Sequence, residues 1–245
     1  MKQVIFSIKE NKEIAKNTYK MVLMGDTSGI GGCGQFVNIA LPGLYLRRPI
    51  SVCDYKDGSL TLIYKAVGEG TELMSELDAG TELDILVGLG NGYDTSKSGK
   101  YPLLLGGGVG VPPLYALCKK LIAEGKEPTV ILGFNTKDEV FCADDFKALG
   151  ARVFVTTADG SVGIKGFVTD AMEEAGNYTY FYTCGPEPML KEVYNASKTS
   201  GQFSFEERMG CGFGACMGCS CKTITGYKRI CKEGPVLGKE EILWK

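Results

Sequence analysis

Up to about residue 95, the chain alternates apolar and polar positions in short runs, the pattern of strands that bury one face. Gly, Pro, Asn and Asp separate these runs, and only residues 72–77 suggest a turn or so of helix. Many short strands joined by glycine-rich turns predict an antiparallel β-barrel. The clearest predicted strands are residues 19–23, 35–41, 60–66 and 82–87.

The pattern changes near Gly99, where apolar strands begin to alternate with helical segments. This alternation predicts a parallel, doubly wound sheet. The expected strands are residues 102–105, 129–134, 152–156 and 178–183, and the expected helices are a segment ending near Ala123, then 139–149, 166–175 and 187–199. We therefore predict a multi-domain β plus α/β fold, with a barrel at 1–97, a doubly wound domain at 98–200 and a small C-terminal domain at 201–245.

Composition narrows the classes of function. The formal net charge of −2 over 245 residues argues against nucleic acid or an anionic membrane as a partner. We find no segment of membrane-spanning length and no signal peptide, so ten cysteines favour a reducing cytoplasm and metal or redox chemistry. The chain has no histidine, which excludes Ser-His and Cys-His catalysis as well as Rieske clusters, but leaves electron and hydride transfer through cofactors open.

The most specific chemical signal is a set of cysteines near the C-terminus. Their spacing is C-x4-C-x2-C, followed by a fourth cysteine after eleven intervening residues, which is the plant-type pattern for a 2Fe–2S cluster. Interleaved glycines allow a loop to wrap a cluster closely. Structural zinc and a disulfide-stapled tail remain alternatives, and Cys221 is a further candidate ligand. The favoured ligands are Cys211, Cys216, Cys219 and Cys231.

Two motifs in the predicted barrel suit a phosphorylated, ring-bearing cofactor. In the run 47–52, a cation followed by a small hydroxyl on a strand is able to hold a pyrophosphate and a flavin ring, respectively. Farther on, Gly70 and Thr71 open a short helix, where free N–H groups favour a phosphate. The alternatives are a solvated basic pair for the first motif and an ordinary hairpin with a capped helix for the second.

Two further motifs lie in the predicted α/β domain. The glycine run after its first strand allows the backbone to approach a dinucleotide, although tight strand–helix packing is an alternative. The sequence Cys184-Gly185-Pro186 follows the last predicted strand, where open α/β sheets bind ligands, and Cys184 is a candidate for contact with a nicotinamide ring. Its alternative is a small buried hydrophobe. The predicted NAD residues are Gly107, Gly108, Gly110, Cys184 and Gly185.

The order of these motifs, R-x-x-S, then a glycine-rich loop, then C-G-P-x-x-M, resembles the ferredoxin–NADP reductase superfamily. The cysteine segment at 207–219, together with 227–236, looks like that of the electron-transfer subunits of NAD-dependent, two-subunit dihydroorotate dehydrogenases. The resemblance covers nearly the whole chain, and the cysteine segment is its most specific part.

The resemblance implies FAD in the barrel, a 2Fe–2S cluster on the four cysteines and NAD+ as electron acceptor. It also implies an FMN-containing catalytic partner that oxidises dihydroorotate in pyrimidine biosynthesis, in a heterotetramer of two catalytic and two electron-transfer subunits. Electrons would then pass from FMN to the cluster, to FAD and to NAD+. The FAD contacts that it implies are Arg48, Pro49, Ile50, Ser51, Ile63, Tyr64, Lys65, Gly70 and Thr71.

Two other functions remain open. One is a sister reductase subunit that uses NAD(P)H and serves a glutamate-synthase-like protein, a sulfite reductase or a ferredoxin. The other is a non-enzymatic interaction protein with a zinc-binding tail. The α/β domain shows no clear basic cluster for a 2′-phosphate, which favours NAD over NADP.

Overall fold

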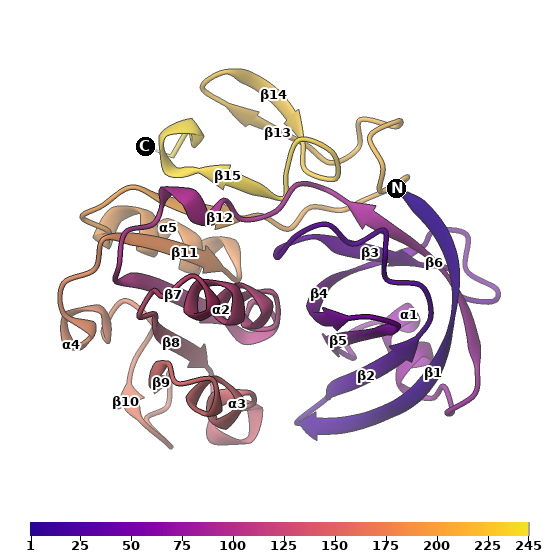
Figure 1. Ribbon diagram of the computed structural model, residues 1–245, viewed down its shortest axis with the longest axis horizontal. Coiled ribbons are helices and arrows are strands. Elements are labelled where there is room, and N and C mark those ends of the chain that lie inside the picture. The colour runs from indigo at the N-terminus through magenta and orange to yellow at the C-terminus, as the bar shows by residue number, and fades with distance from the viewer. Residues whose placement is uncertain (245) are drawn as a thin grey trace.

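A closed antiparallel barrel occupies the N-terminal part of the computed structural model, which describes residues 1–244 (Figure 1). Apolar side chains at alternate positions point inward, as in β6, where Leu83, Ile85 and Val87 are buried. The barrel prediction is confirmed, and the long first strand adds to those predicted. The strand order is β1 (Lys2–Ala15), β2 (Thr18–Met24), β5 (Ser59–Lys65), β4 (Arg48–Lys56), β3 (Phe36–Ile39) and β6 (Glu82–Leu89), with the short helix α1 (Glu69–Ser75) after β5.

The second sheet is parallel except for its last strand and is flanked by helices, as predicted. Its order is β10 (Ile164–Lys165), β9 (Arg152–Thr157), β8 (Thr129–Phe134), β7 (Pro102–Gly107), β11 (Tyr180–Cys184), β12 (Gly201–Ser204) and β15 (Val236–Gly238). The helices are α2 (Pro113–Ala123), α3 (Ala143–Ala148), α4 (Met172–Ala175) and α5 (Glu187–Ala196). The strand order reverses between β7 and β11, so their carboxyl ends border the crevice where such sheets bind ligands.

Two of the predicted helices are much shorter than expected. The helix predicted at 139–149 begins only at Ala143, because Cys142 before it has a left-handed φ of 61°. Of the helix predicted at 166–175, only α4 forms. Gly166 has a φ of 125°, which no helix accommodates, and the Asp170 carboxylate accepts a hydrogen bond from the Phe167 N–H at 2.6 Å, which stabilises a turn instead.

The segment after residue 200 both extends this sheet and forms a separate layer (Figure 1). Strand β12 pairs in parallel with β11, and β15 pairs antiparallel with β12. Between them, the chain forms the cysteine loop and a hairpin of β13 (Ser220–Thr223) and β14 (Gly226–Arg229). The sheet therefore continues past the boundary predicted at residue 200, and the cysteine loop is tethered to it on both sides.

The barrel and the parallel sheet, each with a core of its own, also share an apolar cluster at their boundary. Ile63 and Cys53 of the barrel pack in the same buried cluster as Leu114 and Cys118 of α2. At its edge, the Lys119 ammonium of α2 donates to both carboxylate oxygens of Asp54 at 2.7 Å. The two halves are therefore held together by burial as well as by charge.

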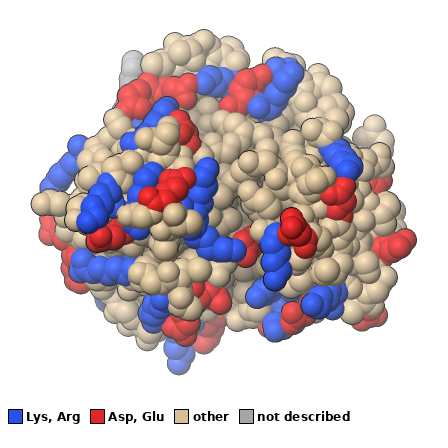
Figure 2. Space-filling view, viewed as in Figure 1, with Lys and Arg blue, Asp and Glu red and all other residues tan. Residues whose placement is uncertain are grey.

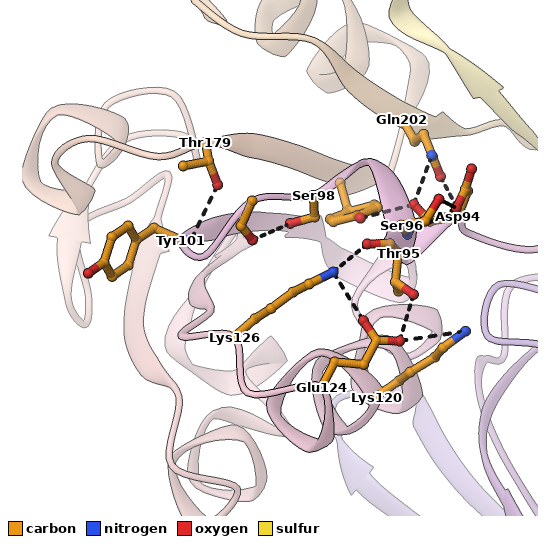
Figure 3. Close-up of polar contacts among 12 residues, drawn as sticks. Asp94, Thr95, Ser96, Ser98, Tyr101, Lys120, Glu124, Lys126, Thr179 and Gln202 are labelled. Atoms are coloured by element: carbon orange, nitrogen blue, oxygen red, sulfur yellow. Dashed lines mark hydrogen bonds and ion pairs between the residues drawn. The ribbon is translucent and has the colours of Figure 1, made fainter.

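The segment that connects the two halves, residues 94–101, is hydrogen-bonded to the rest of the protein along its length (Figure 3). The Asp94 N–H donates to the Gln202 side chain at 2.9 Å, which links the connection to β12. The Thr95 hydroxyl donates to Glu124 at 2.8 Å, at the end of α2. The Tyr101 N–H donates to the Thr179 hydroxyl at 3.2 Å. These bonds attach the connecting segment to the sheet domain.

Lys and Arg are interspersed with Asp and Glu on the face shown in Figure 2, and no single-sign patch covers it. None of the helices in residues 1–244 is long and apolar enough to cross a membrane.

Candidate functional site: a flavin cavity between a dinucleotide crevice and a cysteine loop

A cavity of about 310 Å³ lies where the barrel faces the segment that follows β12. Strands β4 and β5 and the start of α1 provide one wall, and residues 204–207 with Met209 and Pro235 provide the other. Of the residues predicted to contact FAD, seven line this cavity, which we therefore call the flavin cavity: Pro49, Ile50, Ser51, Ile63, Tyr64, Lys65 and Thr71.

The other two predicted FAD residues, Arg48 and Gly70, lie against each other beside this cavity. A methyl group added to Gly70 would sit 2.0 Å from Arg48 Nε, so the guanidinium rests directly on the backbone at the start of α1. Within residues 1–244, Arg48 has no carboxylate partner; its Nη1 donates to the Leu46 carbonyl. A cation placed without an acid, beside free helix N–H groups, suits a phosphate.

A larger cavity of about 580 Å³ occupies the crevice between the carboxyl ends of β7 and β11. It has the size and the position expected of a dinucleotide site at the switch point of an open sheet. Gly107, Gly108, Gly110 and Gly185, four of the five predicted NAD residues, line it.

The glycines of this crevice are needed for two different structural reasons. A methyl group on Gly110 would lie 2.3 Å from the Cys184 carbonyl oxygen, and one on Gly107 would lie 2.4 Å from Met189 Sδ. Close packing of the two loops therefore requires these glycines. Gly108 differs, because it has a φ of 50° and no atom within 4 Å of its missing side chain, so its backbone is bare toward the cavity.

Cys184 is the predicted NAD residue that does not line the crevice. Its side chain is 2% exposed and packs in the core with Tyr93 and Tyr182. Burial raises the pKa of its thiol. Its role in nicotinamide binding stays a prediction, and as placed the thiol behaves as a small buried hydrophobe.

The two cavities meet, since Lys65, Val109 and Glu206 line both. Lys65 also forms an ion pair with Glu139 at 2.9 Å, which joins the barrel to the loop before α3. A flavin ring and a nicotinamide ring held in adjoining cavities are able to come into the direct contact that hydride transfer needs.

Glu206 is a cavity residue that the sequence reasoning missed. It is accessible to solvent, yet protein crowds its carboxyl group, and this burial raises the pKa of Glu206. No local pattern marks it, because a glutamate before the cysteine run looks like any other surface acid.

The cysteine loop brings its ligand candidates together in two pairs. In the first pair, the Cys211 N–H donates to Cys216 Sγ at 3.4 Å, and the Ala215 and Cys216 N–H groups donate to Cys211 Sγ at 3.2 and 3.4 Å. In the second pair, the Cys231 N–H donates to Cys219 Sγ at 3.4 Å. Among residues 1–244, no three His, Cys, Asp or Glu side chains surround one point as a single ion would require. Two cysteines for each iron is the arrangement of a 2Fe–2S cluster.

The electrostatics of the two pairs differ. Burial raises the pKa of the Cys211 thiol, but backbone N–H groups of Cys216, Phe213 and Ala215 outweigh it and lower that pKa to about 6. Burial, followed by the contact with Cys219, raises the pKa of Cys231 to about 12. N–H groups aimed at sulfur stabilise the thiolate form that binds iron, so the loop fits the cluster.

The two pairs also differ in exposure. Cys219 and Cys231 are each 2% exposed, whereas Cys211 is partly exposed and Cys216 is exposed. The buried pair packs with Phe36 of β3, and Phe36 also lines the flavin cavity. One side of the loop therefore faces the flavin cavity through an aromatic ring, and the other faces solvent.

Cys221 lies on β13, next to the loop. Its Sγ contacts the Lys222 carbonyl at 3.8 Å, and burial, followed by the charges of Glu207 and Glu187, raises its pKa. None of the thiol contacts within the two pairs involves it, which favours the predicted set of four.

Comparison with known proteins identifies the family. A family model described as the iron–sulfur cluster binding domain of dihydroorotate dehydrogenase B matches residues 206–243, and one described as the oxidoreductase NAD-binding domain matches residues 104–195. The electron transfer subunit of dihydroorotate dehydrogenase B (NAD(+)) from Fusobacterium nucleatum is 46% identical over 94% of this chain and 94% of its own length. This chain belongs to that family. The corresponding subunit from a Geobacillus strain is 42% identical over 99% of both chains.

Two solved structures share the fold of this chain. A structure of an NADH-dependent reduced ferredoxin–NADP oxidoreductase superposes with a TM-score of 0.88 at 31% identity, over 98% of this chain and 90% of that one. A ferredoxin NADP+ reductase from Neisseria gonorrhoeae shares the fold, with a TM-score of 0.70 at 18% identity over 80% of this chain and 90% of its own.

These matches decide between the alternatives left open by the sequence. The chain is an electron-transfer oxidoreductase subunit, and the predicted cofactors, a 2Fe–2S cluster, FAD and NAD, are confirmed for it as a member of this family and fold. The names of the relatives at 42–46% identity favour dihydroorotate dehydrogenase over the sister reductases, and the match to an iron–sulfur domain rejects a zinc tail. Which residues hold each cofactor stays a prediction supported by the geometry above.

Cys219→Ser is expected to abolish the iron–sulfur cluster while FAD binding and flavin reduction by NADH persist, because Cys219 lies in the buried pair and outside the flavin cavity wall. Iron and acid-labile sulfide analysis, with the flavin absorbance, measures this. Cys221→Ser is the matched control and should keep the full cluster. Equal iron content in the two variants would contradict the ligand assignment.

Arg48→Ala is expected to weaken FAD retention, since a charge-assisted contact with phosphate contributes about 1.5–3 kcal/mol. Flavin release on serial dilution measures the loss. Arg47→Ala is the control: Arg47 is paired with Asp84 at 2.8 Å, so its loss should lower thermal stability more than flavin affinity. The assignment of Arg48 fails if both variants retain flavin equally well.

Proposed function

We propose that this chain receives electrons from a separate catalytic subunit that oxidises dihydroorotate on FMN, and delivers them to NAD+ in pyrimidine biosynthesis. The observation that carries the proposal is the position of the flavin cavity. It shares Lys65, Val109 and Glu206 with the dinucleotide crevice, and it shares Phe36 with the core around Cys219 and Cys231.

A cluster supplies one-electron transfer, a flavin exchanges single electrons for electron pairs, and NAD+ accepts a hydride. The residues of this chain hold these groups in position relative to one another. The cysteine pairs hold the cluster beside the barrel, β4, β5 and α1 hold the flavin, and the bare backbone at Gly108 admits the dinucleotide. Phe36 and Pro235 fill space between flavin and cluster and keep water out of that wall.

The exposure of the cysteines supports a route for the electrons through this chain. The exposed side of the cysteine loop is the side from which electrons enter, and the buried pair is the side from which they leave. Large apolar side chains in the loop beside the exposed pair support docking of a partner there: Phe213 is 44% exposed and Met217 53%.

The partner's FMN, the heterotetramer of two catalytic and two electron-transfer subunits and the cytoplasmic location are the finer parts of this proposal. The family name supports a catalytic partner, because an electron transfer subunit presupposes one. Neither a site for dihydroorotate nor the base that its oxidation requires is apparent in the sequence, which also supports a separate catalytic subunit.

The test is anaerobic purification of the native complex, followed by identification of the partner and a dihydroorotate-dependent NADH assay. The proposal predicts an FMN-containing partner and NADH formation that needs both subunits. The Cys219→Ser complex should still pass electrons from dihydroorotate to an artificial dye but form no NADH. A different partner, with no response to dihydroorotate, would make the chain a sister reductase.

A further inference from the structure

Strand β3 lies between the predicted flavin residues and the cysteine loop, and its outer face carries two side chains. Val37 and Ile39 point into the barrel core, so Phe36 and Asn38 point outward. Within the barrel, Phe36 pairs with Ser51 and Asn38 with Pro49, both predicted FAD residues. Phe36 lines the flavin cavity and packs with Cys219 and Cys231.

Asn38 makes the second contact of this face, and it touches a ligand residue of the loop. Its side chain is 1% exposed, and its Nδ2 donates to the Cys211 carbonyl at 3.4 Å. This bond requires an N–H donor and thus fixes which end of the amide faces the loop. Gly212, with a φ of 76°, packs so closely on the amide that a methyl group there would lie 2.3 Å from Nδ2. Asn38 therefore contacts both residues of the Cys211–Gly212 peptide.

The backbone beneath this amide is rigid. Asn38 is paired with Leu86 of β6 as well as with Pro49 of β4. Arg47 Nη1 donates to the Asn38 carbonyl at 3.3 Å while its other nitrogen binds Asp84 at 2.8 Å. A side chain held this firmly imposes its position on the loop rather than following it.

The other end of the amide is unusual. Asn38 Oδ1 is fully buried and has no hydrogen-bond partner among residues 1–244. A buried acceptor without a donor is costly, and an apolar side chain of the same size would avoid that cost. Packing alone therefore does not explain an asparagine here, whereas the N–H donated to the loop does.

We propose that Asn38 is a positioning residue that anchors the Cys211–Gly212 peptide to the barrel and thereby raises the reduction potential of the cluster. Holding the Cys211 carbonyl on Asn38 fixes the start of the loop in which the Ala215 and Cys216 N–H groups donate to Cys211 Sγ. An N–H group directed at the cluster stabilises its reduced, more negative form. This inference rests on the proposed function, since it assumes a cluster on these cysteines.

The test compares Asn38→Leu and Asn38→Ala with the unsubstituted chain in redox titrations followed by electron paramagnetic resonance. Both variants lack the donor, but Leu fills the space and Ala leaves it empty, so a shift common to both reports the lost hydrogen bond. The expected result is a lower cluster potential, on the order of tenfold in the equilibrium constant for electron uptake, about 59 mV for one electron. The flavin potential and flavin reduction by NADH should not change.

Asn91→Leu is the matched control. Asn91 also anchors the C-terminal segment: its Nδ2 donates to the Glu233 and Val236 carbonyls at 3.1 and 2.7 Å, and its Oδ1 accepts from the Val236 N–H at 2.9 Å. None of these hydrogen bonds involves the backbone of a predicted cysteine ligand. Its loss should lower thermal stability and leave the potential of the remaining clusters unchanged.

An unshifted potential in both Asn38 variants would overturn the inference, and so would an equal shift in Asn91→Leu. Loss of the cluster from both Asn38 variants, with retention in Asn91→Leu, would reduce Asn38 to a structural role and would also overturn it. The titration needs neither partner nor dihydroorotate, so it is independent of the proposed function's own test, in which failure appears as absent NADH formation by the unsubstituted complex.

Discussion

The structure depends on the packing of the segment after β12 against the outer face of β3. This contact closes the flavin cavity on one side and buries Cys219 and Cys231 on the other, with Phe36 common to both. Electron transfer needs its centres close together and fixed, and a buried aromatic contact supplies both conditions. The cysteine spacing predicts a cluster, and this packing places the predicted ligands Cys219 and Cys231 next to the cavity predicted for the flavin.

The second requirement is that the dinucleotide crevice stays next to the flavin cavity. The ion pairs Lys65–Glu139 and Lys119–Asp54 and the apolar cluster shared by Ile63 and α2 all cross between the barrel and the parallel sheet. The connecting segment is bonded to α2 and β12 as well (Figure 3). A charged pair at such a boundary contributes modestly when it is partly exposed, so the shared apolar cluster accounts for most of the rigidity.

The sequence predicts correctly those features that depend on residues close to one another along the chain. Cysteine spacing, the glycine run after β7 and the alternation of strands with helices each depend on neighbours along the chain, and they predicted the fold class and the glycines that line the dinucleotide crevice. The predicted residues of the flavin cavity came mainly from the family resemblance. Prediction from sequence fails for features that depend on contacts between segments distant in sequence. Cys184 ends a strand at the crevice, but its thiol packs into the core. The roles of Phe36, Asn38 and Glu206 come from segments distant in sequence, and no periodicity marks them. The helix predicted at 166–175 was wrong over most of its length because one glycine with positive φ and one aspartate favour a turn.

The central claim is that one chain links its cluster, through the flavin cavity, to NAD+. The most direct measurement is rapid mixing of the isolated, fully reduced chain with NAD+ under anaerobic conditions, following the flavin and cluster absorbances together with NADH. The fully reduced chain holds three electrons, two on the flavin and one on the cluster, and NAD+ takes two of them as a hydride. The account predicts one NADH per chain, followed by transfer of the cluster's electron to the oxidised flavin, seen as reoxidation of the cluster together with a half-reduced flavin. Oxidation of the flavin with a cluster that stays reduced would contradict it, because the cluster would then have no path to the flavin within this chain.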